Sequence, residues 1–238
     1  MQATGDSKPQ LPKWVPAFGV FALLSLVATQ AFALFFTPPD RDMGELMKIM
    51  YVHVPSAWIA FLAFGAVALG SVLYLWRRDI RFDLFAAAAA ELGTVLTALC
   101  IVQGSIWGRP TWGVWWTWDP RLTTTAIMLI VYAGYLALRS FTDDEERRAR
   151  WSAAVGIIGA INVPIVWYSV TWWRTIHQVQ SNTTTMDPIY VLALLLNLTT
   201  FLFLFIYLLR VRYHVALLER SADARLEERA LGAGVVHV

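Results

Sequence analysis

Residues 14–36 read WVPAFGVFALLSLVATQAFALFF, a run without Asp, Glu, Lys or Arg. An α-helix rises about 1.5 Å per residue, so about 20 apolar residues cross the hydrocarbon core of a bilayer. The run is therefore long enough to form a transmembrane helix. Similar runs follow over residues 55–76, 84–106, 122–138, 152–172 and 188–209. We predict an all-α integral membrane protein with six transmembrane helices, the second of which opens at Pro55.

The overall composition is that of a membrane protein. Of the 238 residues, 58% are hydrophobic and 15% are charged, whereas soluble domains carry about 25% charged residues. The mean hydropathy is +0.53. The net charge of +2 comes without a basic tract, so we expect no nucleic-acid partner. Cys100 is the single cysteine, which excludes an intramolecular disulfide and a Cys-x-x-Cys-His attachment site for heme.

The distribution of Lys and Arg predicts the orientation in the membrane. Fourteen of these residues lie in the N-terminal segment, the second and fourth connections and the C-terminal tail, and five lie in the other three connections. By the positive-inside rule, both termini are cytoplasmic. We predict a cytoplasmic segment 1–13, a membrane domain 14–209 and a cytoplasmic tail 210–238, with outward loops at 37–54, 107–121 and 173–187. The first apolar run is longer than the core of an ordinary signal peptide, so we expect it to be retained.

The middle outward loop is rich in tryptophan. Residues 107–123 read WGRPTWGVWWTWDPRLT and hold five of the twelve tryptophans of the chain. Gly108, Pro110 and Gly113 argue against a regular helix over at least the first half of this segment.

Four of these tryptophans suggest a binding platform. Indoles at the ends of spans commonly form an aromatic belt at headgroup depth, and Trp58 near the start of the second span fits that interpretation. A cluster inside one loop must instead cover something, because indoles expose large apolar surfaces. A flat, apolar, conjugated ligand would stack on them. The platform residues we predict are Trp112, Trp115, Trp116 and Trp118.

Two charged residues follow the platform. Asp119-Pro120 is typical of a helix N-cap followed by a first-turn proline, and Asp187-Pro188 repeats this pattern before the sixth span. Arg121 then lies in the first turn of a helix, where the helix dipole disfavours a cation. It could bind an anion, or it could simply extend toward the membrane surface.

Two histidines lie near the same side of the membrane. His53 is at the outward end of the second span and His177 follows the fifth. Two imidazoles beside an aromatic platform could supply both axial ligands of a heme iron, whereas a closed zinc site normally needs four ligands. Two propionates could pair with the available cations, which are Lys48, Arg109, Arg121 and Arg174.

One carboxylate lies inside a predicted span. Glu91 follows five alanines in the third apolar run. An intramembrane carboxylate often has a function, but Glu91 could equally be neutral and hydrogen-bonded between helices.

These motifs resemble a known family. WGVWWTWD at residues 112–119 resembles the tryptophan-rich WWD motif of heme-handling proteins. Together with MYVHVPSAW at residues 50–58 and the histidine after the fifth span, it is similar to the heme exporter protein C family (CcmC) of the bacterial cytochrome c maturation system. The resemblance covers about residues 40–210 and agrees with six spans. Larger relatives with the same motif, such as heme lyases and synthetases, carry more spans and more histidines.

The resemblance implies a function and a set of partners. It implies a protein of the bacterial inner membrane that holds heme b non-covalently, and transiently, on its periplasmic face. The iron ligands would be His53 and His177, and the remaining contacts would come from the tryptophan platform, Asp119, Arg121, Lys48 and Arg109. Heme would pass to a periplasmic chaperone, protein E, beside an ABC transporter of subunits A and B and a small protein D. The covalent chemistry would belong to the chaperone, so this chain would be a transfer protein and not an enzyme.

Three alternatives remain open. The chain could be a permease for a hydrophobic solute, a scaffold without a ligand, or a heme synthetase or lyase component. It lacks the repeated halves and paired discontinuous spans of many transporters. A purified heme binder would be coloured, whereas a scaffold would be colourless. A synthetase would form thioether-linked cytochrome without the chaperone.

Overall fold

The computed structural model describes residues 10–177 and 186–235, with side chains to residue 231. The first nine residues of the predicted N-terminal segment and most of the third outward loop lie outside this part of the chain. Six helices of the described part are long and apolar enough to cross a membrane, which confirms the predicted fold class. The elements are α1 Trp14–Phe36, η1 Glu45–Ile49, α2 Met50–Arg77, α3 Ile80–Trp112, α4 Pro120–Ser140, α5 Glu145–Ala160, α6 Asn162–Trp172 and α7 Pro188–Val235.

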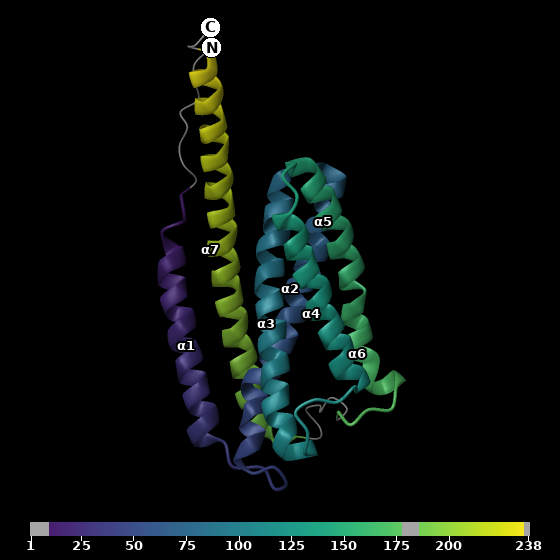
Figure 1. Ribbon diagram of the computed structural model, residues 1–238. Helices are drawn as coiled ribbons and strands as arrows, with labels where there is room; N and C mark the ends of the chain where they lie inside the picture. The colour runs from purple at the N-terminus through teal and green to yellow at the C-terminus, as the bar shows by residue number, and fades with distance from the viewer. Residues whose placement is uncertain (1–9, 178–185, 236–238) are drawn as a thin grey trace.

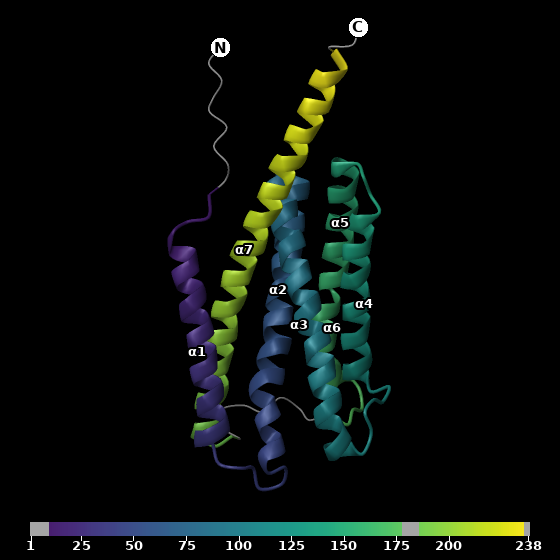
Figure 2. The same ribbon diagram turned by 60° about the vertical axis from the view of Figure 1, so that its left-hand side comes forward.

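The helices form an elongated bundle. α1 packs along α7, and α2 and α3 lie between this pair and the group formed by α4, α5 and α6 (Figures 1 and 2). The α1–α2 and α3–α4 connections lie at one end of the bundle, and the start of α1 and the end of α7 lie at the other (Figure 1). This arrangement follows from an even number of antiparallel spans.

Some helices begin or end away from the predicted positions. α2 begins at Met50, so Pro55 lies inside the helix and does not open it. His53 is therefore in the first turn of α2 and not in a loop. The fifth span is divided at Ile161 into α5 and α6. α7 continues to Val235, so the predicted tail extends the last transmembrane helix.

The expectation that the first half of the tryptophan segment is not a regular helix is wrong for residues 107–112. α3 continues to Trp112 with Pro110 inside its last turn. A proline removes only one backbone hydrogen bond, and neighbouring groups in transmembrane helices commonly compensate for it. Gly113 ends the helix with a φ of 80°, and its N–H donates to the carbonyl of Arg109. The irregular connection between α3 and α4 is therefore residues 113–119.

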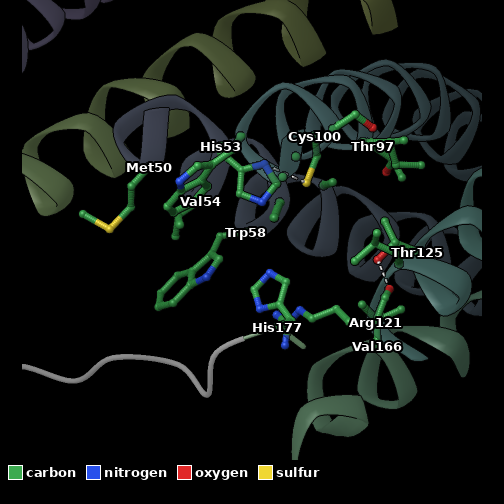
Figure 3. A pocket seen from close by; sticks show the side chains of 18 of the residues that line it. Met50, His53, Val54, Trp58, Thr97, Cys100, Arg121, Thr125, Val166 and His177 are labelled. Carbon is green, nitrogen blue, oxygen red and sulfur yellow. Dashed lines mark hydrogen bonds between the residues drawn. The ribbon is translucent and has the colours of Figure 1, made fainter. Parts of the chain in front are cut away.

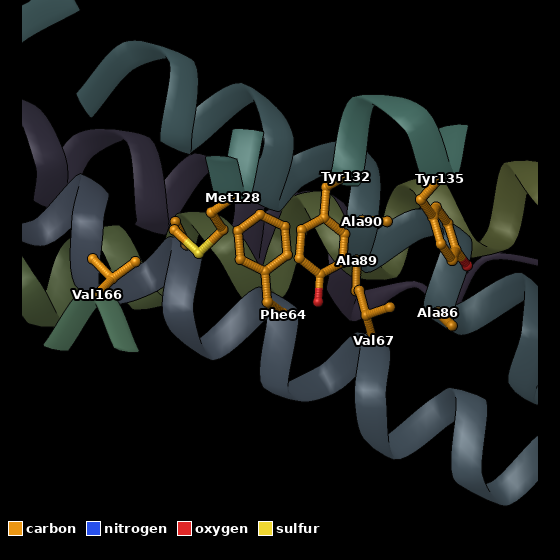
Figure 4. Close-up of a cluster of buried hydrophobic side chains, with 10 residues drawn as sticks. Phe64, Val67, Ala86, Ala89, Ala90, Met128, Tyr132, Tyr135 and Val166 are labelled. Atoms are coloured by element: carbon orange, nitrogen blue, oxygen red, sulfur yellow. The ribbon is translucent and has the colours of Figure 1, made fainter. Parts of the chain in front are cut away.

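Aromatic residues stack in the centre of the bundle (Figure 4). The rings of Phe64 on α2 and Tyr132 on α4 are 3.7 Å apart between centroids and nearly parallel, at 12°. Tyr135, Met128 and buried alanines of α3 complete this cluster. Small alanine side chains let α2 and α3 approach closely, so the middle of the membrane domain is tightly filled.

Ion pairs join the helices at the end of the bundle that carries the C-terminus. The guanidinium of Arg139 on α4 donates to both oxygens of Asp83 on α3, at 2.6 and 2.8 Å. Arg212 on α7 donates to both oxygens of Glu91, at 2.5 and 2.8 Å. Glu91 therefore forms an interhelical pair with Arg212.

Candidate functional site

A cavity of about 350 Å³ opens at the end of the bundle that holds the tryptophan-rich connection. Small-molecule sites commonly measure about 300–1,000 Å³. Its wall residues lie on α2, α3, α4, α6 and α7, in the α1–α2 and α3–α4 connections and in the segments next to the ends of α6 and α7. Figure 3 shows a selection of them. Ala60, Met128 and Val166 belong both to these walls and to the aromatic cluster of the core. The packed core therefore closes the inner end of the cavity.

His53 lies on the cavity wall in the first turn of α2. Its ring meets the indole of Trp107 edge to face, with 5.8 Å between centroids. Its Nδ1 is 3.7 Å from Sγ of Cys100. Gly104 gives the ring its space, because a Cβ at this position would be 3.1 Å from Cε1 of His53. Close packing against α3 thus fixes where this imidazole lies.

His177 reaches the same cavity from the segment after α6 (Figure 3). Its ring lies 6.0 Å from the indole of Trp112, measured between centroids. Its backbone N–H donates to the hydroxyl of Thr175 at 3.0 Å. Two histidines that are 124 positions apart in the sequence therefore face one space.

Asp119 caps α4, as predicted, and also binds the segment that carries His177. Its Oδ1 accepts from the backbone N–H of Arg121 at 2.9 Å. Its Oδ2 accepts from the hydroxyl of Thr175 at 2.5 Å and from the N–H of Ile176 at 2.8 Å. Asp187 also caps its helix, with Oδ1 accepting from the N–H of Ile189 at 3.0 Å.

Arg121 places a cation in the cavity wall. Its Nη1 is buried and has no hydrogen-bond partner among the described residues. A buried, unpartnered donor of a charged group carries a large desolvation cost. An anionic group in the cavity would remove this cost by accepting from Nη1.

The other predicted site residues divide into two groups. Trp112 and Trp116 line the cavity together with the two histidines and Arg121. Trp115 and Trp118 do not line it, and they are 60% and 80% exposed.

The predicted cations other than Arg121 also lie off the cavity wall. Lys48 pairs with Glu45 at 2.7 Å and donates to the carbonyl of Leu34. Arg109 donates to the carbonyl of Gly113, and Arg174 is exposed. The ligand contacts predicted for Lys48, Arg109 and Arg174 therefore stay predictions. The same holds for the contacts predicted for Trp115 and Trp118.

Several wall residues are not among those predicted from the sequence. Trp58, assigned above to the aromatic belt, lines the cavity, as do Trp107 and Cys100. Helical periodicity could have found them. Starting at His53, the wall residues of α2 recur at 3–4-residue spacing, and those of α3 do the same through Cys100, Gly104, Trp107 and Thr111. The small residues Gly104 and Gly108 also mark a helix face that other groups approach closely.

The residues present suit a flat, largely apolar ligand that carries a coordinating metal and an anionic edge. The wall supplies indoles for stacking, two imidazoles that can each donate a lone pair to iron, and one guanidinium whose Nη1 has no hydrogen-bond partner in the described part of the chain. Among the described residues no group of three or more His, Cys, Asp or Glu could hold a bare metal ion.

These features define a class: six-span membrane proteins with a histidine-flanked apolar cavity at one end of the bundle. The sequence model of the heme exporter protein C family matches residues 7–228. The chain is 36% identical to heme exporter protein C of Haemophilus influenzae over 88% of this chain and 87% of that protein. It is 33% identical to the protein of that name from Rhodobacter capsulatus, over 96% and 93% of the two chains. The identity to the Bradyrhizobium diazoefficiens protein is 38%, over 79% and 73%.

The chain belongs to the heme exporter protein C family, as its motifs indicated. This membership assigns it a heme-export role in cytochrome c maturation, as a multi-pass membrane protein with bacterial relatives.

Proposed function

We propose that the cavity binds heme b non-covalently, with His53 and His177 as the two axial ligands of the iron. The observation that carries this proposal is that both imidazoles line one apolar cavity, although they come from different helices and connections. Each histidine is held by neighbouring side chains, so the iron would meet ligands in nearly fixed positions.

Each further wall residue has a role in this proposal. The indoles of Trp112, Trp116 and Trp107 would contact the porphyrin and exclude water. Nη1 of Arg121 would donate to a propionate, which would satisfy its unpartnered position. With the iron and one propionate both fixed, the porphyrin could not turn in its plane. A vinyl edge would then be presented in one orientation.

The position of the cavity supports the proposal that heme is delivered to a partner. Its inner end is closed by the core and its mouth is at the end of the bundle, so heme would leave on the side that it faces. By the distribution of Lys and Arg, this is the outer face of a bacterial plasma membrane. We propose that a periplasmic heme chaperone receives the heme there, beside an ABC transporter of subunits A and B and the small protein D. The covalent chemistry takes place on the chaperone, so this chain transfers heme without a catalytic residue of its own.

The closed inner end also bears on the permease alternative. A permease must offer its solute a route through the bundle. Here Ala60, Met128 and Val166 belong both to the cavity wall and to the packed cluster around the stacked rings of Phe64 and Tyr132. Heme transfer at one face needs no such route, so the geometry favours the binding and delivery function.

Titration of the detergent-purified protein with heme tests this proposal. Wild-type protein should develop a Soret band that saturates at one heme per chain, and it should pass this heme to the purified chaperone. Arg121→Gln should weaken retention of heme, with Arg41→Gln as the matched control, because Arg41 is exposed and does not line the cavity. A protein that stays colourless in excess heme would refute the proposal and favour the scaffold alternative.

A further inference from the structure

The carboxylate of Asp119 connects two parts of the chain that are far apart in the sequence. It is 6% exposed and does not line the cavity. One oxygen caps the start of α4, and the other accepts two hydrogen bonds from residues 175 and 176. Three donors on one buried carboxylate form a strong junction, because hydrogen bonds to an ionised acceptor are about twice as strong as neutral ones.

We infer that Asp119 is a positioning residue, which holds His177 in place for the iron and does not itself contact heme. The inference rests on the proposed function, because it assumes that His177 is an iron ligand. It assigns the aspartate of the tryptophan motif to the protein framework, in contrast to the ligand contact predicted from the sequence.

The hydrogen bonds run in one direction from His177 to the carboxylate. The N–H of His177 donates to the Thr175 hydroxyl, and that hydroxyl donates its own proton to Oδ2 of Asp119. The N–H of Ile176 makes a second, independent bond to the same oxygen. The backbone on the N-terminal side of His177 is thus fixed at two points, and its side chain can point into the cavity.

The same carboxylate also links Arg121 to the segment that carries His177. Oδ1 binds the N–H of Arg121, whose guanidinium lines the cavity. Asp119 therefore sets the position of Arg121 relative to that of His177. In the proposed complex these two residues hold a propionate and the iron, so their separation must match the porphyrin.

The substitution Asp119→Asn distinguishes the helix cap on α4 from the hydrogen bonds to residues 175 and 176. An asparagine oxygen can still accept from the N–H of Arg121, which keeps the cap. Its NH2 group would then face the Ile176 N–H, and two donors cannot bond to each other. Asp187→Asn is the matched control, because Asp187 caps α7 in the same Asp-Pro pattern. Thr175→Val is a second variant, which replaces the hydroxyl by a methyl group. Thr175→Ser is its control, because serine keeps the hydroxyl.

The first readout is the absorption spectrum of the heme-loaded protein. Asp119→Asn and Thr175→Val should lose the low-spin signature of two axial imidazoles while heme stays bound through His53. Free imidazole should restore that signature, since it would fill the vacated position on the iron. Asp187→Asn and Thr175→Ser should keep the wild-type spectrum. A wild-type spectrum in both Asp119→Asn and Thr175→Val would overturn the inference.

The second readout needs no heme. Amide hydrogen exchange of peptides that cover residues 173–177 should be faster in heme-free Asp119→Asn than in Asp187→Asn. Unchanged exchange would also overturn the inference. Failure of the proposed function looks different, because wild-type protein would then bind no heme although the exchange difference would persist.

Discussion

Gly104→Ala tests the geometry around His53. The added Cβ would lie 3.1 Å from Cε1 of the imidazole, whereas carbon atoms in good contact are about 3.5–4.0 Å apart. The ring must therefore move away from α3 by about half an ångström. A side chain forced about 30° from its preferred rotamer costs about 0.5–1.5 kcal/mol. Because 1.4 kcal/mol is tenfold in an equilibrium constant, the Kd for heme should rise about two- to thirteen-fold.

Heme titration and thermal unfolding together make this prediction specific. Alanine is about 1 kcal/mol more favourable than glycine inside a helix, so the heme-free variant should unfold no earlier than wild type. Gly65→Ala in α2 is the matched control, because its Cβ would have no neighbour within 4 Å, and it should bind heme normally. If Gly104→Ala binds heme with wild-type affinity and spectrum, the reasoning about His53 is wrong.

Two further predictions concern the packing of the bundle and the aromatic wall. Asp83→Asn leaves the buried guanidinium of Arg139 without its charged partner, since these side chains are only 3% and 13% exposed. It should cost about 3–5 kcal/mol in unfolding measurements in detergent, and replacing both by Leu and Met should recover most of the loss. A single variant as stable as wild type would contradict this expectation. Trp112→Ala should weaken heme binding about fivefold, from the loss of about 1 kcal/mol of ring contact. Trp151→Ala should not, because this exposed indole is on α5 and does not line the cavity. Equal effects of the two substitutions would argue against Trp112 as a heme contact.

The sequence predicts the fold well because its apolar runs are long and contain few charged residues. A membrane helix must satisfy every backbone group internally, so each long apolar run can adopt only one structure. α1 begins and ends at the predicted residues. The ends of α2, α3 and α7 are less predictable, because prolines and charged residues near the membrane surface are compatible with a helix when neighbouring groups support it. Pro55 and Pro110 both lie within helices for this reason.

The site is only partly predictable from the sequence. Residue type and position suggest His53, His177 and Arg121, and all three line the cavity. Lys48 was equally plausible, but its ammonium pairs with Glu45 and the Leu34 carbonyl. Such local pairing depends on how the connection 37–49 turns, which no periodicity encodes.

Asp119 shows a second limit to what can be predicted from the sequence. Its Asp-Pro pattern predicts the helix cap, which the structure confirms. The same pattern carries no sign of the two bonds to residues 175 and 176. Contacts between distant segments become visible only when the tertiary structure places them together.

The central claim, that His53 and His177 together hold the heme iron, is tested most directly by spectroscopy of histidine variants. The absorption spectrum of heme-loaded wild-type protein should be compared with those of His53→Ala, His177→Ala and the double variant. The account predicts a six-coordinate low-spin wild type, loss of that signature in each single variant, its recovery with added imidazole, and loss of heme from the double variant. A wild-type spectrum in both single variants would place the iron ligands elsewhere and contradict the account.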